Sequence, residues 1–320
     1  MEDNKTSIII LHHFGKLIER CLKSLENVNA DKIVISSDVD KYNQSIMNNF
    51  VYCWRNESTF KRNWGGEFSK GRYIVFMDDD IEIKYDCIKR MEDYLNKYPK
   101  VGMVYAMLYK MDNHNKIDTS GSFLSWCGFL YETYIDRIRP IPILSGKSAL
   151  CMIRKELFNN IGKFDEDFII YGEETDLSWR VWLAGYKVMV LPSAIGYHAF
   201  ETTLKPKSYY NPYYIHYHGC KNYITMLIKN LPANKLYIVL INTFIWFIMG
   251  CLMWFKNRQA SKWIFEGIWY NIRNFRYIWQ KRQKIQKNAD HSYWKLIYKN
   301  PPLFYYLKRF KDYFYHNLHG

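Results

Sequence analysis

The stretch YIVFMDDD at residues 73–80 is an apolar run of strand length that ends in three successive carboxylates. Other short apolar, β-branched runs lie before and after it, separated by segments with helical periodicity. The runs that predict strands are Ser7–Leu11, Lys32–Ser36, Tyr73–Met77 and Val101–Tyr105, and those that predict helices are Lys16–Leu25, Phe60–Ser69 and Lys84–Tyr98. This alternation predicts a mostly parallel α/β sheet. Ligands bind such sheets at the carboxyl ends of the strands, which is where the acidic run falls.

Three adjacent carboxylates repel one another unless a cation or solvent relieves the repulsion. Mg²⁺ and Mn²⁺ prefer oxygen ligands and bind diphosphates through one or two carboxylates, so Asp78, Asp79 and Asp80 are candidate metal ligands. For an isolated acidic triplet, a solvated turn capping the next helix is the better interpretation. A second acidic group in the sequence reverses that preference.

The second acidic group lies in FDEDFIIYGEETDLSWR at residues 164–180. Glu173, Glu174 and Asp176 open a predicted helix at Glu174–Gly185, whose first turn tolerates negative charge. Helix capping accounts for one of these acids. A group of carboxylates between Gly172 and Arg180 indicates a site in which one acid acts as a base and others fix its position.

Several motifs in this order resemble those of glycosyltransferase family 2. EETDLSWR resembles the family's ED-x-DL-x-x-R element, and GKFDEDF at 162–168 resembles its G-x-FDE-x-F. FMDDD at 76–80 resembles the DxD motif, and KRNWGG at 61–66 resembles the RN-x-G donor-binding element. His198 in IGYHAF resembles the histidine that completes the metal site. The resemblance covers residues 6 to about 225. YHGCKNYITMLIKNLP at 217–232 is most similar to the rhamnosyltransferase-like members that build surface polysaccharides.

The resemblance implies a GT-A fold, an α/β nucleotide-diphospho-sugar transferase fold, and a single-displacement transfer that inverts the anomeric centre. It implies a nucleotide-diphosphate sugar donor of the dTDP-rhamnose or UDP-hexose type and a glycan or lipid-linked saccharide acceptor. A divalent cation, Mn²⁺ or Mg²⁺, would be held by Asp80 and His198, with Asp78 near the ribose or the metal. Glu174 would be the base. The remaining implied site residues are Glu173 and Asp176 in the catalytic group and Arg62, Asn63 and Gly65 in the donor site.

Two positions depart from the family pattern. The family's acid after the second strand is replaced by Ser36 in IVISSDVDK, so Asp38, two residues later, is our candidate for the nucleobase contact. The base is commonly Asp in the family and is Glu174 here. Glutamate is longer by one methylene, so the acceptor hydroxyl could lie slightly farther away while the chemistry is unchanged.

The basic charge of the chain lies in its last third. Residues 201–320 hold 19 Lys/Arg and 4 Asp/Glu, whereas residues 1–200 hold 26 and 27. A basic segment rich in Trp and Tyr fits an anionic surface, either lipid headgroups or nucleic acid. We therefore predict a GT-A catalytic domain at 1–205, with a donor-binding half at 1–105 and an acceptor half at 106–205, and a helical region at 206–320.

Leu236–Phe255 contains no charged residue over 20 positions, about the length that spans hydrocarbon as a helix. A single crossing with the sugar-nucleotide site in the cytosol would place the basic tail outside, against the positive-inside bias, and a re-entrant or in-plane attachment, or a hairpin, resolves that conflict. Residues 263–287 carry apolar side chains near helical spacing together with Lys and Arg, as interfacial helices do. We expect attachment to the cytoplasmic face of a membrane through about residues 236–280.

Other classes of protein remain as alternatives. A nucleotidyltransferase would carry a Gly-rich basic loop after the first strand, which LHHFGK at 11–16 lacks. A non-enzymatic protein that binds membranes or nucleic acid through its basic third is the main alternative, with nucleic acid disfavoured by the uncharged run. Residues 107–145 predict irregular or hairpin structure. The seven cysteines form no CxxC pair and favour a reducing compartment, no secretion signal is recognised, and homo-oligomerisation is left open.

Overall fold

A computed structural model describes residues 6–12, 17–37, 50–136, 138–199, 211–302, 304–306 and 308. The chain forms two compact units. The N-terminal unit consists of Met1–Ser122 and Glu132–Lys205, and the C-terminal unit of Phe123–Tyr131 and Pro206–Gly320. The segment Phe123–Tyr131 thus packs with the C-terminal residues, although the sequence placed it in the acceptor half. The predicted domain limits themselves stay a prediction.

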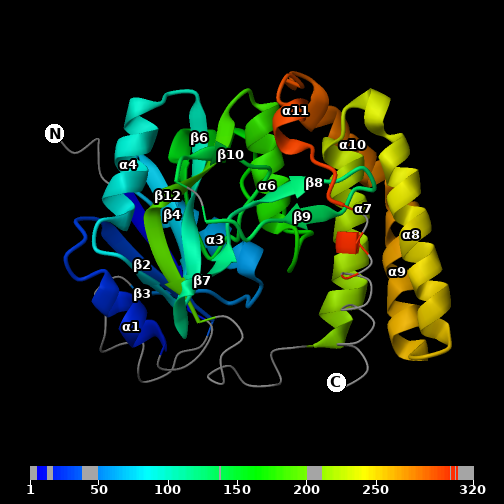
Figure 1. The fold of residues 1–320 in the computed structure, drawn as a ribbon, viewed down its shortest axis with the longest axis horizontal. Coiled ribbons are helices and arrows are strands. Elements are labelled where there is room, and N and C mark those ends of the chain that lie inside the picture. Colours follow the sequence, from blue (N-terminus) through cyan, green and yellow to red (C-terminus); the bar gives the residue numbers. More distant parts are fainter. Residues whose placement is uncertain are drawn as a thin grey trace. The chain divides into compact units, whose positions relative to one another are not determined.

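The N-terminal unit is built on one ten-stranded sheet with the order β10-β12-β6-β11-β4-β1-β2-β3, to which β5 and β7 add at β12 and β6 (Figure 1). Its strands are β1 (Thr6–Leu11), β2 (Asp31–Ser36), β3 (Phe50–Tyr52), β4 (Tyr73–Asp78), β5 (Ile81–Ile83), β6 (Val101–Lys110), β7 (Asn113–Thr119), β10 (Ile141–Pro142), β11 (Leu150–Arg154) and β12 (Lys187–His198). A two-stranded sheet contains β8 (Ser122–Leu124) and β9 (Leu130–Glu132).

The direction of the strands matches the mostly parallel sheet that the sequence predicts. Strand β1 lies parallel to both β2 and β4, and β12 lies parallel to β6. The antiparallel strand β11 separates β4 from β6 and pairs with both, so β4 and β6 run the same way. The four predicted strands all form. The predicted hairpin structure after residue 107 includes the antiparallel pair of β6 and β7.

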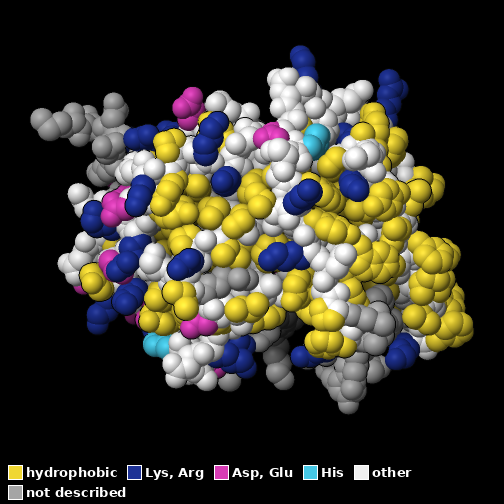
Figure 2. Space-filling model, turned by 45° about the horizontal axis from the view of Figure 1, so that its top comes forward, with side chains coloured by type: hydrophobic (Ala, Val, Ile, Leu, Met, Phe, Trp, Pro, Cys, Tyr) yellow, Lys and Arg dark blue, Asp and Glu magenta, His cyan; other side chains and the backbone are white. Residues whose placement is uncertain are grey.

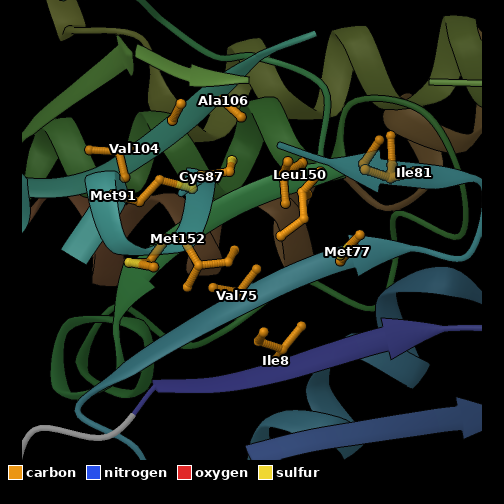
Figure 3. Close-up of a cluster of buried hydrophobic side chains, with 14 of the residues drawn as sticks. Ile8, Val75, Met77, Ile81, Cys87, Met91, Val104, Ala106, Leu150 and Met152 are labelled. Atoms are coloured by element: carbon orange, nitrogen blue, oxygen red, sulfur yellow. The ribbon is translucent and has the colours of Figure 1, made fainter. Parts of the chain in front are cut away.

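Helices cover both faces of this sheet. They are α1 (Leu17–Ser24), α3 (Ser58–Phe68), α4 (Cys87–Lys97), α5 (Lys155–Asn160) and α6 (Glu173–Leu183). On one face, Ile8, Val75 and Met77 pack with Cys87 and Met91 of α4 in the core cluster drawn in Figure 3, to which α1 also contributes. Both faces of β1 and β4 are covered, which is why these strands are continuous apolar runs.

The opposite face of the sheet carries the helices that bear the motifs. Gly65 of α3 lies against Ile9 and Ile35, Phe158 of α5 packs on Phe76, and Ser178 of α6 is 2.7 Å from the hydroxyl of Tyr105. Helices α3 and α6 are therefore fixed to the same face. Arg62 of α3 and the first turn of α6 contribute side chains to the candidate site at the carboxyl end of β4.

The C-terminal unit is helical, as predicted, with a π-helical turn at Tyr214–His218 and a 3₁₀ turn at Ala233–Lys235. Its helices are α7 (Gly219–Asn230), α8 (Tyr237–Trp254), α9 (Arg258–Arg273), α10 (Phe275–Gln286) and α11 (Trp294–Ile297). By length and composition, one helix in the described residues, Ala233–Trp254, could cross a membrane, with 33% of its apolar window buried.

The predicted interfacial stripe at 263–287 is only partly correct. Helix α9 ends at Arg273 and α10 begins at Phe275, so the stripe does not lie on one continuous helix. Ile264 and Ile268 are buried in the core of the unit, whereas Ile272 and Phe275 are exposed. Packing against α7 and α8 thus buries two of the apolar side chains, Ile264 and Ile268, that the sequence assigned to a lipid surface.

Candidate active site

The acidic run lies at the carboxyl end of β4 and leads directly into β5. Strand β5 pairs antiparallel with the end of β12, in a register that sets His198 opposite Ile81. Asp80, the residue before Ile81, is thereby brought to His198, and Nε2 of His198 lies 3.4 Å from Oδ2 of Asp80. The two predicted metal ligands, 118 positions apart in the sequence, therefore meet as buried side chains.

Asp118 and Lys147 complete this part of the site, and the sequence did not identify either. Oδ2 of Asp118 lies 2.8 Å from Nδ1 of His198, and Nζ of Lys147 donates to the same carboxylate at 2.8 and 2.9 Å. Burial alone would lower the pKa of His198, but the hydrogen bonds with Asp118 and Asp80 outweigh it and raise the pKa. Burial would raise the pKa of Asp118, and the bonds from His198 and Lys147 lower it instead.

Arg62 connects the two acidic groups. It projects from α3 with its side chain only 3% exposed; one nitrogen lies 3.0 Å from Oδ1 of Asp78 and another lies 3.3 Å from Oε1 of Glu173. A buried guanidinium between two carboxylates is held by charge as well as by hydrogen bonding. The end of β4 and the start of α6 therefore form one site.

Glu173 and Glu174 form the first turn of α6 after Gly172. Gly172 has a φ of 83°, in the left-handed region that glycine adopts without strain. Burial and the neighbouring carboxylate of Glu173 raise the pKa of Glu174 well above its ordinary value. Burial also raises the pKa of Glu173, although Arg62 opposes the change. A carboxyl with a raised pKa is suited to accept a proton near neutral pH.

Other predicted site residues fix the segment that precedes α6 and do not face the Glu173 and Glu174 carboxylates. Asp176 is buried and bonds Arg180, whose guanidinium also donates to the carbonyl of Ile161 at 2.7 Å. The side-chain amide of Asn63 donates to the carbonyl of Phe164 and accepts from its N–H, both at 2.9 Å. Both pairs fix the segment that leads into α6.

Gly65 does not join the group of carboxylates. A Cβ atom on Gly65 would clash with Cγ2 of Ile9, so the glycine allows α3 to approach β1 closely. Asp38 lies outside the described residues. Asp79, the middle acid of the run, pairs with His12 at 2.7 Å.

The described residues contain no group of three or more His, Cys, Asp or Glu side chains arranged to hold a metal ion. Asp78 is turned to Arg62, so the predicted set of Asp78, Asp80 and His198 does not come together as one group. Asp80 and His198 still fit a divalent cation as a pair. The contact of Nδ1 with Asp118 leaves Nε2 on the side of Asp80, which is how metal-binding histidines are usually oriented.

A mostly parallel sheet, with acids at the carboxyl end of a central strand and a second acidic group opening a helix, defines the class: the protein has the GT-A fold of nucleotide-sugar-dependent glycosyltransferases. The family model described as "Glycosyl transferase family group 2" matches residues 73–303, so the chain belongs to that family.

Similar curated proteins are polypeptide N-acetylgalactosaminyltransferases. Polypeptide N-acetylgalactosaminyltransferase 14 of Homo sapiens is 26% identical over 226 residues, which are 61% of this chain and 41% of the relative. N-acetylgalactosaminyltransferase 4 of Drosophila melanogaster is 25% identical over 193 residues, 54% of this chain and 30% of the relative. The chain thus spans less than half the length of these relatives.

Solved structures share the fold at low identity. S. aureus TarS 1–349 has a TM-score of 0.54 and 13% identity, with 88% of this chain and 89% of that chain covered. GalNAc-T7 with UDP, GalNAc and Mn²⁺ has a TM-score of 0.53 and 14% identity, with 84% and 57% covered. The mannosyltransferase PcManGT of Pyrobaculum calidifontis, with GDP-Man and Mn²⁺, has a TM-score of 0.51 and 12% identity, with 89% and 86% covered.

Proposed function

We propose that this protein is an inverting, divalent-metal-dependent glycosyltransferase that transfers a sugar from a nucleotide-diphosphate donor to a glycan or lipid-linked saccharide. The observation that carries the proposal is the contact of Arg62 with both Asp78 and Glu173, because it joins a donor-side acid to the proposed base group. Membership in the family supports the reaction class. The fold neighbours bound to UDP or GDP-Man with Mn²⁺ support the donor class.

Asp80 and His198 are the residues we assign to a cation, Mn²⁺ or Mg²⁺. A divalent cation bound there would act as a Lewis acid on the leaving diphosphate. Asp118 orients the imidazole of His198, and Lys147 in turn balances the charge of Asp118. Asp78 lies on the donor side of the site, where Arg62 compensates part of its charge.

Glu174 is the residue we assign as general base. In a single displacement, the acceptor oxygen forms a bond to the anomeric carbon while the bond to the diphosphate breaks, and the hydroxyl proton passes to the Glu174 carboxylate. General bases of this kind typically contribute about 10²- to 10⁴-fold in rate. Glu173 modulates the pKa of Glu174, and Asp176 and Asn63 hold the loop that positions both.

The finer assignment follows the sequence motifs. We assign the donor to the dTDP-rhamnose or UDP-hexose type and the pathway to surface polysaccharide or glycoconjugate synthesis, in keeping with the segment at 217–232. We place the protein at the cytoplasmic face of a membrane, attached through its C-terminal unit. A lipid-linked acceptor suits such an enzyme, because enzyme and acceptor would then be confined to the same surface.

The test is nucleotide release by the full chain in detergent from a panel of UDP-, GDP- and dTDP-sugars, with Mn²⁺ or with EDTA. Wild type is compared with Asp80→Ala and Glu174→Gln, and Asp93→Ala, which removes an exposed acid on α4, is the matched control. Metal-dependent release that only the first two variants lose supports the proposal. Release without metal, or equal release by all variants, contradicts the mechanism. If no sugar nucleotide binds and a salt-sensitive complex with nucleic acid forms instead, the non-enzymatic alternative is favoured.

A further inference from the structure

Helix α8 carries no charged residue and is largely apolar, but only one of its sides is covered. Its covered side packs into the core of the C-terminal unit through Ile238, Trp246, Met249 and Met253. The opposite side exposes large side chains at spacings of mostly three and four residues, and we name it the α8 strip. It consists of Tyr237, Leu240, Phe244, Phe247, Ile248, Leu252, Trp254 and the adjacent Phe255. Figure 2 shows hydrophobic side chains gathered at the right-hand edge, where α8 and α9 lie.

Specific contacts fix which side of α8 is covered. The amide of the buried Asn242 donates to the carbonyl of Cys127 at 2.9 Å. The hydroxyl of Ser261 on α9 donates to the carbonyl of Gly250 at 2.7 Å, and the ring of Phe265 lies close to Gly250. These contacts tie both halves of α8 to its own unit. The α8 strip is therefore a fixed face of the folded unit.

Cations flank both ends of the strip. Nζ of Lys235 lies 5.9 Å from the ring centroid of Tyr237, and the guanidinium of Arg258 lies 5.5 Å from that of Trp254. Lys256 is exposed between Phe255 and Arg258. Aromatic and basic residues at the edges of an apolar face match the boundary between acyl chains and anionic headgroups. This charge pattern favours a lipid surface over a second copy of the same basic unit, which it would repel.

The neighbouring helix determines the orientation. Helix α9 packs beside α8, and its exposed side chains include Arg258, Lys262, Glu266 and Arg273. If α8 crossed the bilayer, these charges would enter the hydrocarbon region beside it, where charged groups are strongly disfavoured. An orientation in the plane of the membrane immerses the α8 strip and leaves the charged side of α9 in water.

We propose that the α8 strip is an in-plane, one-leaflet binding surface for an anionic membrane. This inference rests on the membrane attachment in the proposed function, and it adds the face, the side chains and the orientation. It also removes the topological conflict of a single crossing, because the basic residues on both ends of α8 stay on the same side of the bilayer.

The first test is flotation of the full chain with phosphatidylcholine vesicles, with and without phosphatidylglycerol. Wild type should bind, more tightly when the anionic lipid is present. A variant with Leu240→Ser, Phe244→Ser and Phe247→Ser should bind about a thousandfold more weakly, since each of the three large apolar side chains contributes about tenfold. Ile138→Ser, at an apolar position 96% exposed in the N-terminal unit, is the control and should bind as wild type does. Unchanged thermal unfolding would show that the triple variant is folded.

The second test measures the depth of nitroxide labels at Leu240→Cys, Phe247→Cys and Trp254→Cys, each with Cys251→Ser because the other cysteines are buried. Equal shallow depth at all three supports the in-plane surface. A label at 247 that lies about 10 Å deeper than the other two would indicate a crossing helix and overturn the proposal. The proposal would also be overturned if the wild-type protein did not bind vesicles and formed a dimer, while the triple serine variant was a monomer. Neither readout needs catalysis, so donor turnover by the same variants tests the proposed function separately.

Discussion

Asp118 and His198, 80 residues apart in the sequence, share a hydrogen bond of 2.8 Å between Oδ2 and Nδ1. On its other side the imidazole faces Asp80, at 3.4 Å from Nε2. Asp118 accepts from Lys147 as well, so its charge is held by two partners. This chain of contacts fixes which ring nitrogen of His198 faces Asp80.

Asp118→Asn should weaken Mn²⁺ binding about 10- to 100-fold, because residues that orient a metal-binding histidine typically contribute that much. Binding of Mn²⁺ to the protein can be measured directly by electron paramagnetic resonance, without turnover. Lys147→Met should have a smaller effect, since Lys147 acts on the carboxylate of Asp118, one step removed from the imidazole. Equal affinity in wild type and Asp118→Asn would contradict the assigned role.

Arg62→Met should destabilise the fold by about 3 kcal/mol, because it leaves the buried Glu173 and the half-buried Asp78 without the cation that compensates their charge. Urea unfolding followed by fluorescence measures the change. The control is Lys89→Met, which breaks the exposed pair with Asp93 and should cost about 1 kcal/mol or less. Similar losses in the two variants would mean that Arg62 is not a buried link between the acidic groups.

The rate of transfer should fall as the pH is lowered, and the acid limb of the pH profile of kcat should report the titration of the Glu173–Glu174 pair. Burial and the Glu173 charge raise the pKa of Glu174, so this carboxyl keeps its proton to higher pH, and the base form appears only as pH increases. Glu173→Gln removes one of these causes and should move the acid limb to lower pH. The pH profile of kcat measures the shift. A limb that stays in place would assign it to another group.

Gly65→Ala should destabilise the protein by about 1–3 kcal/mol, because the added methyl overpacks the contact of α3 with Ile9. Gly219→Ala is the matched control: a methyl added there would have its nearest neighbour, the ring of Trp246, at 3.8 Å, and the backbone is helical, so the change should be neutral or slightly stabilising. Thermal unfolding distinguishes the two. A raised KM for the donor with unchanged stability would instead support the predicted donor-binding role of Gly65.

Local patterns predicted the strands and helices that carry the motifs. The run at 73–80 is a buried strand followed by acids, and Glu173 and Glu174 open a helix, because both features depend on neighbouring residues alone. The roles of Asp118 and Lys147 depend on how β7 pairs with β6 and β6 with β12, which no local pattern encodes. Arg62 was found through its motif, but its bond to Glu173, 111 positions away, follows from the packing of α3 and α6 on one face.

The apolar residues of 263–287 show a second limit. Periodicity identified an amphipathic segment but gave no information on what covers its apolar side. Ile264 and Ile268 are covered by α7 and α8, and the lipid-facing candidates lie on the outer side of α8 instead. An uncharged helix has no polar side to mark its orientation, so only the packing reveals it.

The excursion of Phe123–Tyr131 into the C-terminal unit means that the polypeptide passes between the two units three times. During synthesis this segment leaves the ribosome long before α7 and α8, against which Gly128 and Phe129 pack. The aromatic side chains of Phe123–Tyr131 therefore lack these packing partners until the last third of the chain has been synthesised. Cutting the chain after residue 205 would recreate that unfinished intermediate permanently, so a catalytic fragment that stays soluble would also need residues 123–131 replaced by a short polar turn.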